Sequence, residues 1–149
     1  MGFGEIYSNK HSMARKLFLN LPVKDVQRST DFFTRLGFSF NPVFSSPDTA
    51  CMVVSEDIHV MLLEEERFRP FTRKQVCNAH THTEALIGID AESREEVDDM
   101  VRRAAANGGT IYAEPQDHGF MYVHSFADPD GHQWEVFWLD QRAAAQKQD

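Results

Sequence analysis

Hydrophobic and polar residues alternate most regularly near the end of the chain, between Phe120 and Leu139. Two runs rich in aromatic residues and valine flank Asp128-Pro129-Asp130-Gly131, whose residue types favour a tight turn, so this stretch predicts a β-hairpin. Side chains of a strand point alternately to its two faces. In the second strand Glu135 therefore shares one face with Gln133, Phe137 and Leu139. This pattern predicts a carboxylate among aromatic side chains.

The first half of the chain predicts one strand, one helix and three more strands. Leucines alternate within residues 16–23, as in a strand with one face against a helix layer. Asp25 suits the N-cap of a helix that ends at Gly37, because glycine readily adopts the left-handed conformation found after helices. Three short strand patterns follow at 38–44, 50–55 and 58–64, separated by turn-forming residues.

The second half predicts the same order of elements. Residues 84–90 alternate as a strand, and Ser93 and Glu96 have the spacing of a capping box at the start of a helix. Asn107-Gly108 ends this helix, and strand patterns follow at 110–113, 120–126 and 133–139. The halves are not visibly alike in sequence, so the repeat is one of architecture. The chain therefore predicts an α+β fold of paired βαβββ modules.

Domain boundaries follow from this repeat. We expect one domain over residues 15–140, with module one at 15–64 and module two at 83–140. The connector, residues 65–82, breaks the periodicity and is long for a compact domain, which indicates a linker, a lid or a short helix. Residues 1–14 are polar and contain glycine and serine, so we expect a mobile N-terminal extension there and a C-terminal tail at 141–149.

Composition narrows the class of protein. With 149 residues, of which 42% are hydrophobic and 26% charged, the chain suits one globular domain. Its formal net charge of −8 argues against a nucleic-acid-binding surface. Two cysteines, Cys51 and Cys77, are too few for a disulfide framework. No apolar run reaches the roughly twenty residues that a membrane-spanning helix requires. We therefore expect a cytoplasmic protein that binds neither nucleic acid nor membrane.

Two segments carry a resemblance to a known family. LPVKDVQRSTDFFTRLGF, which ends at Phe38, resembles the first strand and helix of vicinal oxygen chelate proteins, and DPDGHQWEV, which ends at Val136, resembles their last strand. This superfamily contains glyoxalase I, extradiol dioxygenases, and fosfomycin and bleomycin resistance proteins. The resemblance implies curled mixed sheets around a cleft, a small-molecule ligand or substrate, and a homodimer.

The resemblance also implies a set of metal ligands. Metal-dependent members have one ligand each on the first, fourth, fifth and eighth strands, positions that here hold Phe18, Leu62, Glu84 and Glu135, with Glu64 able to substitute for Leu62. By this resemblance Glu84 and Glu135 are catalytic, and Glu84, Glu135 and Glu64 bind a divalent Zn, Ni, Co, Mn or Fe ion. Phe18 cannot bind a metal, and the two histidines and one carboxylate of an iron dioxygenase are absent from these positions, so that reaction is not expected. If Glu84 and Glu135 lie close together, one of them holds a proton at neutral pH unless a cation lies between them.

Histidines elsewhere offer further candidate ligands. His80 and His82 precede the first strand of module two and are able to approach the mouth of the cleft, although a His-x-His pair in a loop is usually solvated. His118 and His132 lie in or beside turns, where we expect surface positions. His124 should face away from the cleft and is interpreted as structural.

The rest of the expected cleft is mostly apolar, as small-molecule pockets usually are. Its predicted lining is Phe18, Asn20, Leu62, Met121, Val123, Ser125 and Phe137. Three functions are compatible with it. The first is a glyoxalase-type lyase or isomerase, in which a metal polarises a carbonyl group and a glutamate moves a proton. The second is a metal-independent protein that sequesters an aromatic or amphiphilic molecule, as bleomycin resistance proteins do, and its acidic charge suits cationic ligands. The third is a non-catalytic protein that acts through its dimer.

Overall fold

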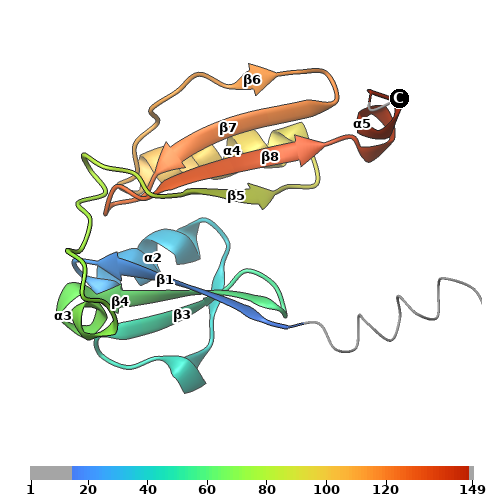
Figure 1. Ribbon diagram of the computed structural model, residues 1–149. Coiled ribbons are helices and arrows are strands. Elements are labelled where there is room, and N and C mark those ends of the chain that lie inside the picture. Colours follow the sequence, from blue (N-terminus) through green and yellow to red (C-terminus); the bar gives the residue numbers. More distant parts are fainter. Residues whose placement is uncertain (1–14, 148–149) are drawn as a thin grey trace, which may run out of the picture.

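The computed structural model describes residues 15–147, so the predicted extension at 1–14 lies outside the described residues. Within this range the chain folds into two modules, each with a four-stranded sheet and one long helix (Figure 1). The order of elements in both modules is strand, helix, strand, strand, strand. The predicted α+β fold of paired βαβββ modules is therefore confirmed.

Module one contains β1 (Leu17–Val23), α2 (Val26–Arg35), β2 (Ser39–Phe40), β3 (Thr49–Val53) and β4 (Ile58–Glu64). The predicted N-cap is present, because the Asp25 carboxylate accepts hydrogen bonds from the backbone N–H groups of Gln27 and Arg28. Gly37 follows the helix with a φ of 107°, which glycine adopts without strain. The strand predicted at 38–44 is shorter than expected, since Pro42 begins a 3-10 turn, η1 (Pro42–Phe44).

Module two contains β5 (Leu86–Asp90), α4 (Arg94–Ala106), β6 (Gln116–Asp117), β7 (Met121–Ala127) and β8 (Gln133–Leu139). The Ser93 hydroxyl accepts a hydrogen bond from the Glu96 N–H at 3.1 Å, as the capping box predicts. The strand predicted at 110–113 is reduced to one bridge between Thr110 and Ala127, and the short edge strand forms later, as β6. The connector contains α3 (Glu65–Phe68) and η2 (Arg69–Phe71), and the predicted tail contains α5 (Gln141–Lys147).

The two sheets have equivalent topologies. Their strand orders are β1-β4-β3-β2 and β5-β8-β7-β6. In each sheet the first and last strands of the module pair in parallel, and all other neighbours pair antiparallel. Both long helices, α2 and α4, lie on the same side of the strands (Figure 1). Each sheet therefore has one face against a helix and one face directed away from it.

The hydrophobic core continues from one module into the other. Phe33 of α2 lies 5.1 Å from Trp134 of β8, and Phe32 lies 5.9 Å from Phe126 of β7, both measured between ring centroids. All four side chains are at most 1% exposed. Burial of an aromatic side chain contributes about 2 kcal/mol or more to stability. These contacts hold the two modules together as one folded unit.

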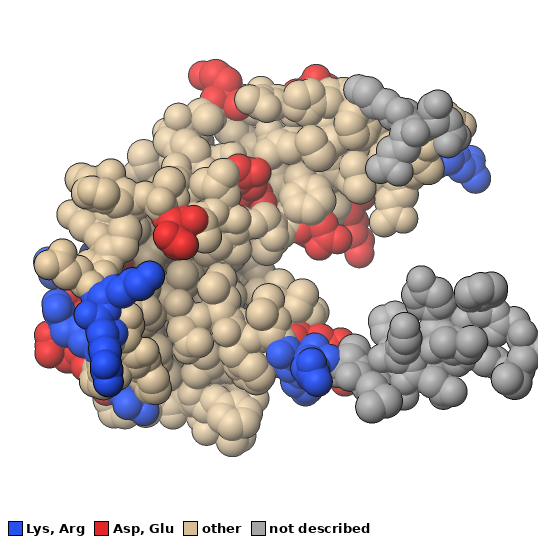
Figure 2. Space-filling view, viewed as in Figure 1, with Lys and Arg blue, Asp and Glu red and all other residues tan. Residues whose placement is uncertain are grey.

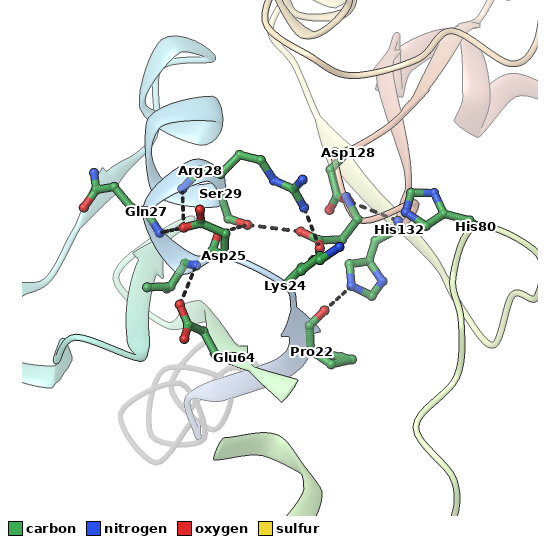
Figure 3. A network of polar contacts seen from close by, with 12 residues as sticks. Pro22, Lys24, Asp25, Gln27, Arg28, Ser29, Glu64, His80, Asp128 and His132 are labelled. Carbon is green, nitrogen blue, oxygen red and sulfur yellow. Dashed lines mark hydrogen bonds and ion pairs between the residues drawn. The ribbon is translucent and has the colours of Figure 1, made fainter. Parts of the chain in front are cut away.

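The turn at residues 128–131 binds module two to the beginning of module one (Figure 3). One carboxylate oxygen of Asp130 accepts hydrogen bonds from the Lys24 backbone N–H at 2.8 Å and from the Arg28 guanidinium at 2.9 Å. The other oxygen accepts a hydrogen bond from the Ser29 hydroxyl at 3.2 Å. We call this group, Asp130 with its three partners, the intermodule clamp.

Two further residues of the same motif complete this contact. His132 Nε2 donates to the Pro22 carbonyl oxygen at 2.7 Å, so His132, which is partly exposed beside the turn as expected, also contacts module one (Figure 3). The Asp128 carboxylate accepts a hydrogen bond from the Trp134 indole at 3.0 Å, and burial raises the pKa of Asp128. The motif that carries the family resemblance at this end of the chain thus joins the two modules.

Candidate functional site

Glu135 lies on the face of the second sheet that is directed away from α4. The pairing of β7 with β8 places Ser125 directly beside Glu135, and the pairing of β5 with β8 places Gly88 on the other side. Because alternate residues share a face, the structure brings a set of partly buried predicted residues together here. This set is Met121, Val123, Ser125, Glu135 and Phe137.

Tyr112 joins this face from the loop between α4 and β6. The bridge between Thr110 and Ala127 aligns the loop antiparallel to β7, which brings Tyr112 alongside Ser125. Burial raises the pKa of the Tyr112 phenol; a hydrogen bond with Ser125 acts in the opposite direction, and the nearby Glu135 carboxylate adds to the rise. Sequence reasoning missed Tyr112, although the strand pattern predicted at 110–113 was a signal that could have found it.

An apolar groove of about 640 Å³ is lined by residues next to Glu135 in the sheet, although Glu135 itself does not line it. Its lining comes mainly from β1 and β4 of the first sheet and β5 and β8 of the second, and it includes Gly88 and Phe137, the neighbours of Glu135 on the same face. Two carboxylates, Asp90 and Glu92, also line it. Further apolar lining comes from Leu17, Leu19, Ile58, Val60, Ile87, Ile89 and Trp138. Ile87, Ile89 and Trp138 belong to the α4 side of the second sheet, so most of the groove lies on the opposite side from Glu135.

A smaller hollow of about 370 Å³ lies on the other side of the polar residues. Its lining includes Tyr112, Gln133 from the Glu135 face, and His80 and His82 from the connector. Both histidines are exposed, and His82 Nδ1 lies 2.8 Å from the Thr81 hydroxyl oxygen. The connector therefore brings two imidazoles to the edge of the sheet face that carries Glu135.

Glu84 does not lie opposite Glu135. The strand predicted at 84–90 begins two residues late, at Leu86, and Glu84 occupies an exposed bend before it. Across the paired strands Glu135 faces Gly88 instead. This arrangement therefore does not favour a proton shared between Glu84 and Glu135.

Leu62 lies on the opposite face of the first sheet from Phe18, so its placement in the predicted pocket is wrong. The pairing of β1 with β4 aligns Phe18 with His59 and Leu21 with Leu62. The Phe18 ring stacks on His59 at 4.8 Å, while Leu62 is fully buried in the core on the helix side. A shift of one residue along a strand moves a side chain to the other face, which is the reason for the error. Asn20 is exposed on the Phe18 face.

Glu64 supports a helix. Its carboxylate oxygen Oε2 accepts a hydrogen bond from the Val26 backbone N–H, in the first turn of α2, at 3.0 Å (Figure 3). A carboxylate at this end of a helix interacts favourably with the helix dipole. Glu64 lies on the same face of β4 as Leu62, directed away from the Phe18 face. The expectation that Glu64 binds a metal with Glu135 is therefore wrong.

The residues present do not fit a divalent metal held by protein ligands alone. Of the four expected positions, Phe18 and Leu62 carry no donor atom. Glu84 lies in an exposed bend before β5, and only Glu135 lies on the sheet face. Within residues 15–147, no group of three or more histidine, cysteine, aspartate or glutamate side chains is arranged to hold a metal ion. Zinc and related ions generally require three or four such ligands.

Comparisons with known proteins give a consistent result. The model of a family described as Glyoxalase/Bleomycin resistance protein/Dioxygenase superfamily matches residues 15–136. Among solved structures, a hypothetical protein from S. aureus is 27% identical, with 84% of this chain and 94% of that chain covered and a TM-score of 0.71. No curated protein matches the sequence significantly.

Two other solved structures have the same fold at lower identity. A glyoxalase/bleomycin resistance protein/dioxygenase family enzyme from Burkholderia phytofirmans is 18% identical, with 85% of this chain and 99% of that chain covered and a TM-score of 0.70. The fosfomycin resistance protein FosX from Listeria monocytogenes is 20% identical, with 84% and 90% covered and a TM-score of 0.60.

Proposed function

Because the chain belongs to the glyoxalase/bleomycin resistance protein/dioxygenase superfamily, we propose that it binds an amphiphilic small molecule on the open face of the second sheet. The ligand has an aromatic or aliphatic body and a protonated amine. Binding requires no metal held by protein side chains. Of the functions compatible with the sequence, this one corresponds to the metal-independent sequestering protein.

The position of Glu135 carries this proposal. Its carboxylate shares a sheet face with the apolar side chains of Met121, Val123 and Phe137 and lies beside two hydroxyl groups, those of Ser125 and Tyr112. A carboxylate in such a place accepts charge-assisted hydrogen bonds from an ammonium group, while the apolar side chains of the same face cover an apolar body. The carboxylates of Asp90 and Glu92 in the groove add to the attraction for a cation.

A second candidate is the glyoxalase-type lyase or isomerase. The observation that favours it is the neighbouring phenol of Tyr112 and carboxylate of Glu135, a proton donor and a proton acceptor on one sheet face. In this function the pair moves a proton on a small carbonyl compound. Turnover of carbonyl substrates that is abolished by both Glu135→Gln and Tyr112→Phe would favour this candidate over simple binding.

Calorimetric titration tests the first proposal. The probe is dansylcadaverine, which combines an aromatic ring system, an alkyl chain and an ammonium group. We expect Glu135→Gln to weaken binding about tenfold, because it removes one charge-assisted hydrogen bond. Glu84→Gln makes the same charge change at an exposed bend and should change the affinity by less than about twofold. Equal effects of the two substitutions, or no saturable binding, contradict the proposal.

Metal titration is the complementary experiment. After removal of metals with a chelator, Zn²⁺, Ni²⁺, Co²⁺ and Mn²⁺ are titrated into the protein and into Glu135→Gln. Tight, stoichiometric binding that depends on Glu135 would replace the proposed function by a metal-dependent one. Weak binding that is unaffected by the substitution is the result that we expect from the donor set.

The assembly and compartment are also proposals. We expect a homodimer in the cytoplasm, and the observation that supports a reducing compartment is that Cys51 and Cys77 are both free thiols. Within residues 15–147, no helix has the length and apolar character needed to cross a membrane. Sedimentation equilibrium of the purified protein tests the dimer, and a monomeric mass at micromolar concentration contradicts it.

A further inference from the structure

We propose that a hollow between the connector and the intermodule clamp binds the phosphate group of a small molecule. The hollow measures about 500 Å³ and lies on the clamp side of the connector, separate from the groove beside Glu135. Three cationic side chains converge on it: Lys24 and Arg28 from the start of α2 and Arg69 from η2. His132 and the connector segment that includes His80 complete its wall.

The walls of this hollow are held in place by direct contacts. A side chain placed on Gly131 would bring its Cβ to 2.7 Å from the His80 backbone nitrogen, so the connector backbone packs tightly against the turn. His132 is anchored by its hydrogen bond to the Pro22 carbonyl. Figure 3 shows that His80 and His132 lie close to the clamp, near Lys24 and Arg28. Three chain segments thus bring cationic residues to one space.

The charge within the hollow is positive. Of its two lining carboxylates, Asp130 is paired with Arg28 at 2.9 Å and Glu65 with Arg69 at 3.4 Å. Arg69 is also 3.3 Å from Glu66, which is exposed outside the lining. Asp130 also accepts hydrogen bonds from the chain, so little of its charge is left to repel an anion. Among the described residues, the ammonium group of Lys24 has no ion-pair partner. Lys24 therefore supplies the excess positive charge.

The rest of the molecule makes this positive site distinctive. The whole chain has a formal net charge of −8, which repels anions from most of the surface. Figure 2 shows lysine and arginine side chains gathered at the end of the molecule where α3 lies. Arginine and lysine are the residues that bind phosphate oxygens best, through charge-assisted hydrogen bonds. The N-terminus of α2 contributes nothing further, because Asp25 and Glu64 already accept hydrogen bonds from its N–H groups.

Isothermal titration calorimetry of the full chain at pH 7 and constant ionic strength tests the proposal. Inorganic phosphate and phenyl phosphate are titrated separately, and tighter binding of phenyl phosphate identifies a phosphate monoester as the ligand class. We expect one site per chain and about tenfold weaker binding in Lys24→Gln and in Arg69→Gln. Arg102→Gln, which removes the same charge from an exposed side chain of α4, should change the affinity by less than about twofold.

A second readout follows from the position of the hollow. A phosphate held by Lys24 and His132 contacts both modules, so phosphate at a few times the wild-type Kd should raise the unfolding temperature of the wild type and of Arg102→Gln, and clearly less that of Lys24→Gln. Glu135→Gln should bind phosphate as the wild type does, which separates this site from the one under the proposed function. Absence of saturable binding, or equal weakening by Lys24→Gln and Arg102→Gln, overturns the proposal.

Discussion

Replacement of Asp130 by alanine should destabilise the protein by about 3 kcal/mol, because it removes the centre of the intermodule clamp. The Asp130 side chain is only 9% exposed. A hydrogen bond to a charged group contributes about 1.5–3 kcal/mol, and the bond from the Lys24 backbone N–H at 2.8 Å belongs to this class. The Arg28 side chain is 43% exposed, so solvent screening reduces its contribution to about 0.5 kcal/mol. The buried Ser29 hydroxyl loses one acceptor but keeps the Asp25 carbonyl oxygen at 3.3 Å, so it adds only about 0.5 kcal/mol.

Urea denaturation of wild type and Asp130→Ala measures this loss as the difference in unfolding free energy. The matched control is Asp99→Ala, since Asp99 also pairs with arginine side chains, Arg102 and Arg103, but on the exposed surface of α4. We expect the control to change stability by less than about 0.5 kcal/mol. If Asp130→Ala costs no more than Asp99→Ala, the reasoning is refuted, because the turn would not hold the modules together.

Two further predictions concern a backbone contact and a titration. Gly131→Ala should destabilise the protein more than Gly119→Ala does. Both glycines have a positive φ, of 89° and 81°, but only at Gly131 would a Cβ collide with backbone, at 2.7 Å from the His80 nitrogen. Equal losses of unfolding free energy in urea denaturation would contradict this prediction. The hydrogen bond from Tyr122 to Asp98, at 2.6 Å, raises the pKa of Tyr122 to about 12. The stabilising effect of this hydrogen bond is therefore complete below pH 10 and is lost as the pH rises through about 12. Phenolate absorbance should show this titration in the wild type and a lower pKa in Asp98→Asn, whereas an unchanged pKa would exclude Asp98 as the cause.

The sequence by itself determined the order of the elements and the face of Glu135. Both follow from local periodicity, since alternation along β8 places Glu135 beside Phe137 and opposite Trp134 whatever the strand packs against. The N-caps Asp25 and Ser93 were equally predictable, because a cap acts on N–H groups only two or three residues away.

Tertiary structure decided which strands share a pocket. Nothing in the pattern of β4 shows whether Leu62 or its neighbours face the helix, because the strand is apolar on both faces, and pairing with β1 placed Leu62 in the core. Tyr112 reached the Glu135 face through one bridge formed between residues 17 positions apart, Thr110 and Ala127, which local propensity does not encode.

The roles of Asp130 and Glu64 also depended on contacts between distant segments. The local sequence predicts Asp130 to be a turn residue, but its carboxylate also accepts a hydrogen bond from Arg28, 102 positions away in the chain. Glu64 reads as a candidate ligand at the end of a strand, but the packing of α2 against β4 places the Val26 N–H within its reach. The sequence determined which side chains had the chemistry of a site, and the packing of one module against the other determined which of them are used to hold the fold.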